Sequence, residues 1–325
     1  MSVTKQNIAD HLGISRTAVS LVLNNTPSST VSEETRIKIL KAAKELGYRD
    51  FEITSKLCFV LYNREPDDPR YMVDLKAIEE MASRHQYSLI FMNVKGTAEE
   101  REKLLKFLNN REVDGVIVTG DIDDPLIQLI EKSEVPYVCY GGTERENVNI
   151  VVLDHRKIAY EATKHLIGLG HRRIACLTGR LGLPVHKRGV EGYRQALEEA
   201  RIPYDQSLVQ VSEEEEGYEL CTRMEDLEIE FTAAFCANTV IQFGVLQRLK
   251  ERGAAVPADI SLVGSGLSSL AKFSLPPLTT IYVSSTEKEK VVTRLIDIME
   301  NKPKPEITYL SNFEWFEGGT TARKK

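Results

Sequence analysis

The sequence predicts an all-α, three-helix helix-turn-helix head followed by an α/β core of two lobes, each built on a doubly wound parallel sheet. Three observations support this fold class. Residues 1–48 contain only helical periodicity with capping residues, residues 57–152 alternate apolar strand-like runs with amphipathic stretches, and the same alternation restarts after residue 152. A chain of 325 residues is long enough for two or three domains.

Residues 4–24 are expected to form two short helices with a tight turn. Apolar side chains recur at helical spacing up to Gly13, which is typical of a helix end, and Ser15 is placed to cap the next helix. The second helix presents Arg16 and short polar side chains, which are groups that contact phosphates and base edges. An ordinary helical hairpin is the alternative, but the short polar face and the helix that follows favour a helix-turn-helix.

A third helix is predicted to follow and to complete the head. Ser32 is placed to cap it and Gly47 to close it. Its expected apolar stripe consists of Ile37, Leu40, Ala43 and Leu46. Residues 1–50 carry a net charge of +2 and the remainder −8, so a DNA contact would be confined to the head.

The core begins at Leu57, where a continuous apolar run predicts a strand buried on both faces. The first lobe is expected to hold strands at 57–63, 88–94, 115–120, 136–142 and 149–152, with helices at 69–86, 97–110 and 124–132. Further helices are expected at 155–169, 187–200, 214–225, 239–252 and 287–300, and strands at 173–179, 207–211, 232–238, 260–266, 279–283 and 307–315. In such sheets ligands bind beyond the carboxyl ends of the strands.

The predicted boundaries follow from this alternation. The head covers residues 1–48, a short polar linker covers 49–56, and the core for effector binding and dimerisation covers 57–325. Within the core, the N-lobe is assigned to about 57–152 plus 286–307 and the C-lobe to about 153–283 plus 308–325.

Several other classes of function are disfavoured. The five cysteines are scattered and mostly lie in apolar runs, which indicates buried hydrophobic residues instead of disulfides or zinc ligands. The absence of a signal-peptide pattern or a long apolar span predicts a cytoplasmic protein. No phosphate loop, nucleophile elbow or metal-ligand spacing is present, so we expect no enzyme activity, cofactor or metal. The acidic run 213–216 is interpreted as a solvated helix start.

The motifs resemble one family along the whole chain. In the head these are T-x-x-x-I-A-x-x-x-G-I-S-x-x-x-V-S-x-V-L-N, V-S-E-E-T-R and E-L-G-Y, and in the core V-D-G-V-I-V, E-G-Y-R-Q-A-L, F-C-A-N, V-P-A-D-I-S-L-V-G and P-P-L-T-T-I. Their order and spacing are similar to the lactose-repressor (LacI/GalR) family of transcription regulators. The resemblance implies a core similar to periplasmic sugar-binding proteins and a homodimer, sometimes a tetramer, on near-palindromic operator DNA.

The resemblance also implies which residues contact DNA. The family's contacts fall on Thr4, Ser15, Arg16, Thr17, Ser20, Leu21, Asn24, Ser32 and Thr35. By analogy Arg16, Thr17 and Leu21 face bases, and the hydroxyls and Asn24 face phosphates. Arg16 can present a fork to guanine, worth roughly 1–3 kcal/mol of discrimination. Leu21 stands where the family often has arginine, so it either contacts a thymine methyl or packs within the head.

The linker departs from the family pattern. The family usually continues after G-Y with Pro-Asn and a hinge helix whose leucine enters the minor groove and kinks the DNA. Here Tyr48 is followed by Arg49-Asp50, and only Ile53 stands near the wedge position. We therefore hypothesise that this protein bends DNA less than its relatives or couples head and core through a short fixed linker.

The effector pocket departs as well. The family's arginine before the G-Y-R-Q-A-L helix is replaced by Gly189, with Arg188 one residue early, and the aspartate after V-G-x is replaced by Gly266. Paired acids and guanidinium groups grip sugar hydroxyls, so their absence at these places leaves three alternatives. The effector is anionic and held by Arg64, Arg180, His186 or Arg188; a sugar is held by other residues such as Tyr62, Tyr140 and Asn238; or the core answers to a protein partner.

The sequence therefore predicts a sequence-specific DNA-binding transcriptional regulator, a repressor of a carbohydrate or related catabolic operon that responds to a small molecule between the lobes. The rival reading, a solute-binding transport protein, is opposed by the head. The candidate effector-binding residues are Tyr62, Arg64, Tyr140, His186, Arg188, Asn238 and Ser265.

Overall fold

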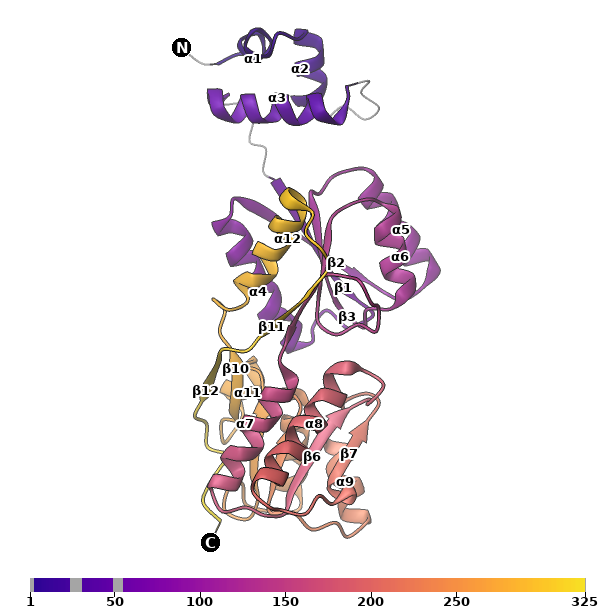
Figure 1. Cartoon of the computed structure of the whole chain (residues 1–325). Helices are drawn as coiled ribbons and strands as arrows, with labels where there is room; N and C mark the ends of the chain where they lie inside the picture. Colours follow the sequence, from indigo (N-terminus) through magenta and orange to yellow (C-terminus); the bar gives the residue numbers. More distant parts are fainter. Residues whose placement is uncertain (1–2, 24–30, 49–54, 325) are drawn as a thin grey trace. The chain divides into compact units, whose positions relative to one another are not determined.

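The chain divides into two compact units, Met1–Ser55 and Lys56–Lys325, which we call the head and the core. The computed structural model describes residues 3–23, 31–48 and 55–324 (Figure 1). Most of the predicted linker, residues 49–54, lies outside the described residues.

The head consists of three helices, as predicted: α1 (Lys5–Leu12), α2 (Arg16–Leu23) and α3 (Glu33–Leu46). Gly13 ends α1 with a φ of 66°, a left-handed conformation that favours glycine. The hydroxyl of Ser15 accepts a hydrogen bond of 3.1 Å from the backbone amide of Ala18 and so caps α2. The turn between the two helices therefore follows from these two residues.

A small hydrophobic core holds the three helices together. Its buried members are Ile8, Ala9, Val19, Val22, Ile39, Ala42 and Ala43. The apolar stripe of α3 differs from the predicted one, because the buried face is centred on Ile39 and Ala42, whereas Ile37 is 59% exposed. Leu40 and Leu46 pack at the edge of this core.

The first lobe is a six-stranded sheet in the order β11-β5-β4-β3-β1-β2. The pairs β1–β3, β3–β4, β4–β5 and β5–β11 are parallel. The strands are β1 (Ser55–Tyr62), β2 (Tyr87–Val94), β3 (Gly115–Gly120), β4 (Tyr137–Tyr140), β5 (Ile150–Leu153) and β11 (Ile307–Leu310).

Helices cover both faces of this sheet. Successive side chains of β1 point to opposite faces, so each set packs against a different pair of helices. Cys58 and Val60 pack with α5 (Ala98–Asn109) and α6 (Asp124–Lys132). On the other face, Leu57 and Phe59 pack with α4 (Pro69–Arg84) and α12 (Glu289–Asn301).

The second lobe repeats the design with the strand order β12-β10-β9-β8-β6-β7. All its registered pairs are parallel except β10–β12. The strands are β6 (Ile174–Gly179), β7 (Val209–Ser212), β8 (Ala233–Cys236), β9 (Ser261–Ser265), β10 (Thr279–Val283) and β12 (Phe313–Phe316). The helices are α7 (His155–Gly168), α8 (Pro184–Glu199), α9 (Gly217–Asp226), α10 (Thr239–Glu251) and the short α11 (Ser269–Phe273). Helices α7 and α8 pack on one face and α9 and α10 on the other.

The chain crosses between the lobes three times, after β5, after β10 and after β11. The third crossing lies later than predicted. The sequence predicts one strand over residues 307–315, with the C-lobe resuming at residue 308. The structure instead has two strands: Ile307–Leu310 pairs with β5 of the first sheet, and Phe313–Phe316 pairs with β10 of the second. Ser311 and Asn312 separate the two strands, so this border lies at residues 311–312.

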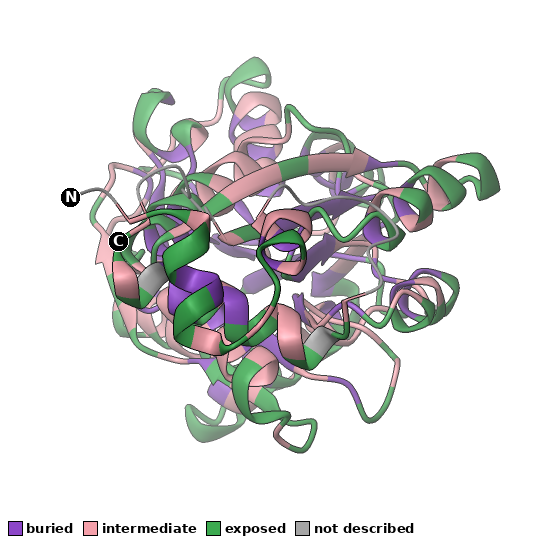
Figure 2. Cartoon of the chain, turned by 90° about the horizontal axis from the view of Figure 1, so that it is seen from above, coloured by how far each residue is buried: buried purple, intermediate pink, exposed green. Residues whose placement is uncertain are grey.

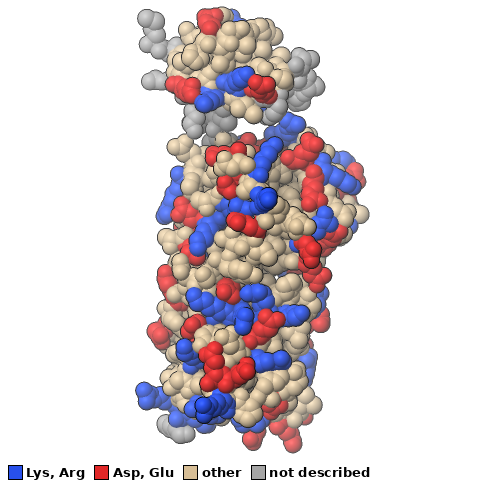
Figure 3. Space-filling view, in the orientation of Figure 1, with Lys and Arg blue, Asp and Glu red and all other residues tan. Residues whose placement is uncertain are grey.

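Figure 2 shows buried residues on the strands and on the inner helix faces, with exposed residues outside. Acidic and basic side chains are interspersed over the visible face of the core in Figure 3. Within the described part of the chain, no helix is both long and apolar enough to cross a membrane.

Candidate functional site

Two surfaces carry the predicted functional residues. The first is the α2 face of the head, where Ser15, Arg16 and Thr17 are exposed and Ser20 is half-buried. Ser20 also accepts a hydrogen bond of 3.5 Å from the amine of Lys5, which adds a positive charge beside this face. The exposed first turn of α2 therefore offers a guanidinium group and hydroxyls together.

Three hydroxyls that the resemblance assigns to phosphates lie at the starts of the three helices. Thr4 caps α1 together with Asn7, Ser15 caps α2, and the Ser32 hydroxyl accepts a bond of 3.4 Å from the amide of Thr35. Helix N-termini attract phosphate groups because their amides and dipole are positive. The caps thus place three anion-attracting helix ends in the head.

Leu21 is half-buried and is not among the residues that pack against the head core. Thr35 is half-buried in the first turn of α3, and its hydroxyl lies 2.9 Å from that of Ser32. Asn24 lies outside the described residues.

The second site lies between the lobes of the core and is centred on Glu215. This residue follows β7 and is 5% exposed. Its φ of 59° lies in the left-handed region of backbone conformation. His186 Nε2 lies 3.0 Å from one carboxylate oxygen, and Asn238 Nδ2 donates to the other over 3.2 Å. Arg70 Nη1, from α4 of the first lobe, also donates to this carboxylate.

Electrostatics keep Glu215 ionised. Burial by itself raises the pKa of this carboxyl, but the hydrogen bond from His186 and the positive charge of Arg70 outweigh burial and lower the pKa to about 2. A carboxylate only accepts hydrogen bonds, so Nε2 of His186 carries the proton. Nδ1 of the same ring lies 3.1 Å from the hydroxyl of Thr178.

The acidic run 213–216 was therefore misinterpreted at Glu215. Its neighbour Glu213 has a side chain that is 70% exposed, as expected for a solvated run, but Glu215 is buried among polar partners. The left-handed turn and the partner in the other lobe have no signature in the local sequence.

The first lobe contributes two guanidinium–carboxylate pairs. Arg64 follows β1 and binds Asp121, which follows β3, with 2.7 Å between Nη2 and Oδ1. Arg70 binds Asp68 through Nε and Nη2, at 3.0 and 2.6 Å. Asp68 also caps α4 by accepting from the amide of Arg70 at 2.9 Å. We call these residues the cleft cluster: Arg64, Asp68, Arg70, Asp121, His186, Glu215 and Asn238.

The two predicted tyrosines have other partners. Tyr62 is fully buried, and its hydroxyl donates to Asp123 and accepts from Arg101 at 3.0 Å each. The Tyr140 hydroxyl donates to Asp74 over 3.1 Å. The structure places these hydroxyls in contacts within the first lobe, which does not favour a ligand role for them.

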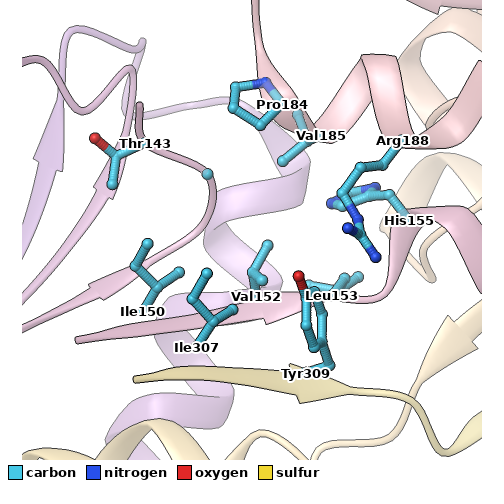
Figure 4. A pocket seen from close by; sticks show the side chains of 11 residues that line it. Thr143, Ile150, Val152, Leu153, His155, Pro184, Val185, Arg188, Ile307 and Tyr309 are labelled. Carbon is cyan, nitrogen blue, oxygen red and sulfur yellow. The ribbon is translucent and has the colours of Figure 1, made fainter. Parts of the chain in front are cut away.

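Arg188 lies apart from the contacts of Glu215. Its guanidinium stacks 4.8 Å from the ring of Tyr309 and is 3.7 Å from Asp154. It borders a cavity of about 70 Å³ between the lobes, whose walls are mainly apolar (Figure 4). In Figure 4 Arg188 and His155 approach this cavity from one side and Ile150 from β5 from another.

The remaining predicted residues either stabilise a helix start, lie buried at a strand end, or lie away from Glu215. Asn238 holds the start of α10, because its side-chain oxygen accepts from the amides of Val240 and Ile241 at 3.0 and 2.9 Å. Ser265 is 7% exposed at the end of β9. The Arg180 side chain is 45% exposed and lies 4.0 Å from Glu213, not beside Glu215.

Sequence reasoning found Arg64, His186 and Asn238 but missed four members of the cluster. Asp121 could have been found, because it directly follows the strand end at Gly120. Asp68 and Arg70 flank Pro69, which marks a helix start at the carboxyl end of β1. Only Glu215 lacked such a signal.

A helix-turn-helix head combined with a two-lobed core and a polar cluster between its lobes defines a ligand-responsive class of DNA-binding transcription regulators. Residues 4–50 match "Bacterial regulatory proteins, lacI family", and residues 54–299 match "Periplasmic binding proteins and sugar binding domain of LacI family". The chain belongs to the LacI family of bacterial transcription regulators, which is not a family of enzymes.

Similar proteins include regulators from several bacteria. The HTH-type transcriptional repressor PurR of Haemophilus influenzae (strain PittEE) is 31% identical over 291 residues, and the HTH-type transcriptional regulator DegA of Bacillus subtilis (strain 168) is 31% identical over 294 residues. Each match covers 86% of this chain and 86% of the relative.

Solved structures agree with this assignment. The transcriptional regulator CelR–cellobiose complex has a TM-score of 0.72 at 27% identity, covering 98% of this chain and 99% of that chain. The lac repressor dimer bound to operator and the anti-inducer ONPF has a TM-score of 0.70 at 24% identity, covering 99% and 100%, and shows the same fold.

Proposed function

We propose that this protein represses a carbohydrate or related catabolic operon as a homodimer, and that a sugar-like effector between the lobes modulates its affinity for DNA. The choice of a sugar-like effector rests on the pairing of Arg64 with Asp121 and of Arg70 with Asp68. Each pair presents donors and acceptors side by side, the arrangement that matches the hydroxyls of a polyol.

An anionic effector is less well supported. The cations that gather in the cleft cluster already have carboxylate partners, whereas Arg180 and Arg188 lie elsewhere. The sugar-bound state of CelR, a relative of the same architecture, also favours a polyol. In this proposal, Arg64 with Asp121 and Arg70 with Asp68 take the place of the acid–guanidinium groups missing from the family's usual positions.

A thermal-shift screen of the full chain against sugars, sugar phosphates and nucleosides tests the effector class. A ligand that binds the folded state raises the Tm by mass action. We expect a neutral sugar to raise Tm and Arg64→Gln to abolish the rise, while Arg180→Gln leaves it unchanged. A rise with sugar phosphates alone would favour an anion, and no rise across the panel would favour control by a protein partner.

DNA recognition is tested by a mobility shift with the upstream region of the protein's own gene. We expect Arg16→Ala to reduce specific binding about 5- to 150-fold, because a bidentate guanine contact contributes about 1–3 kcal/mol. Lys41→Ala, which removes one exposed positive charge from α3, is the matched control and should leave specificity intact. Equal binding to random duplex by the unaltered protein would contradict sequence-specific regulation.

A further inference from the structure

Arg70 and Glu215 join the two lobes of the core. Arg70 belongs to α4, which packs on the first sheet, and Glu215 stands between β7 and α9 of the second lobe. Their side chains are only 22% and 6% exposed, and 145 residues separate them in the sequence. The two side chains therefore connect the two lobes by direct contact.

Each partner is also held in place by hydrogen bonds within its own lobe. Asp68 grips Nε and Nη2 of Arg70, which leaves Nη1 to reach across the cleft. His186 and Asn238 hold the carboxylate of Glu215 from within the second lobe. Since both charges are oriented by lobe-internal bonds, little conformational entropy is lost when they meet.

A second contact between the lobes is steric. Gly142 follows β4 of the first lobe, and Val185 lies in the first turn of α8 in the second lobe. A Cβ atom at position 142 would lie 2.7 Å from Cγ1 of Val185, closer than such atoms approach. The glycine therefore permits the lobes to touch at a point distinct from the ion pair.

We propose that Glu215 is a built-in latch residue, whose bond to Arg70 holds the two lobes of the core together. A ligand group that takes the place of the Glu215 carboxylate at Nη1 of Arg70 breaks this bond, so such a ligand and self-closure compete for the same donor. The inference rests on the proposed function for its regulatory meaning, but closure itself requires neither effector nor DNA.

Amide hydrogen exchange of the full chain without ligand tests the latch. We expect Glu215→Gln to make the amides of residues 63–68 and 212–216 exchange about tenfold faster, while the strand amides of β1 and β6 keep their protection. Gly142→Ala should accelerate the same loops by wedging the lobes apart. Glu213→Gln, the same change in the same acidic run, is the matched control and should behave as the unaltered protein.

Unchanged loop exchange in Glu215→Gln would overturn the proposal, whatever the result for Gly142→Ala. Equal acceleration of strand and loop amides would also overturn it, because that pattern reports global destabilisation. These outcomes are independent of the mobility shift. A core without a latch can still bind its operator through Arg16, and a latched core can still lack specific DNA binding.

Discussion

At the scale of single residues, the cleft cluster shows how a buried charge is maintained. Glu215 faces Arg70 and Arg64 from the first lobe and His186 and Asn238 from the second. Replacing a carboxylate that has such partners leaves cations and donors buried without a counterpart, which is costly. The same environment makes the stability of the core depend on pH.

The pKa of Glu215 is about 2 in the folded chain, below its ordinary value of 4.5. The folded state thus takes up this proton less readily than the unfolded state does. The stabilising contribution of the carboxylate is complete above pH 4.5 and is lost as the pH falls from 4.5 towards 2. We expect the difference in free energy of unfolding between the unaltered protein and Glu215→Gln to shrink over this range.

Urea unfolding at a series of pH values measures this difference. Glu213→Gln serves as the control, since its side chain is 70% exposed and has no buried partners to lose. If the difference in free energy of unfolding between the unaltered protein and Glu215→Gln stays constant from pH 6 to pH 3, protonation of Glu215 is not linked to folding.

At the scale of helices and strands, glycines decide how closely neighbours pack. Gly192 of α8 faces α7, and a Cβ atom there would lie 1.9 Å from the backbone oxygen of Arg156. Gly189, three residues earlier on the same helix, has no atom within 4 Å of the corresponding point. The packing of α7 on α8 requires Gly192, whereas Gly189 leaves open space beside the helix.

These two positions provide a matched pair of substitutions. Gly192→Ala should lower the free energy of unfolding by about 1–3 kcal/mol, because α7 and α8 must separate. Gly189→Ala should raise it by about 0.5–1 kcal/mol, because alanine favours the helix and meets no obstacle. Chemical unfolding of both variants checks the signs, and destabilisation by both would show that the space at Gly189 is filled.

The elements were largely predictable because their signals are local. The continuous apolar run from Leu57 and the helical spacing before Gly13 depend only on neighbours in sequence. The strand expected over 307–315 failed because its two halves belong to different sheets, a fact that depends on β5 and β10 far away in the chain. Glu215 failed for the same reason, since its burial depends on Arg70.

At the scale of the whole molecule, the core is one compact unit despite its two sheets. All five cysteines are buried, and burial raises the pKa of the Cys58 and Cys176 thiols to about 12. Reactive thiolate is therefore nearly absent in the native state.

We expect a thiol reagent at pH 8 to modify none of the cysteines in the native protein and all five in denaturant. The rate of modification at intermediate urea concentrations then reports the opening of the core. Rapid labelling of one cysteine under native conditions would contradict the burial of that site.

The three crossings between the lobes also determine when each part of the chain can fold during synthesis. The head contains all its helices once Leu46 has been made. The first sheet, however, waits for α12 and β11, and the second waits for β12, which ends at Phe316. We therefore expect the head to fold during translation, whereas both lobes are completed only after Phe316 has been synthesised.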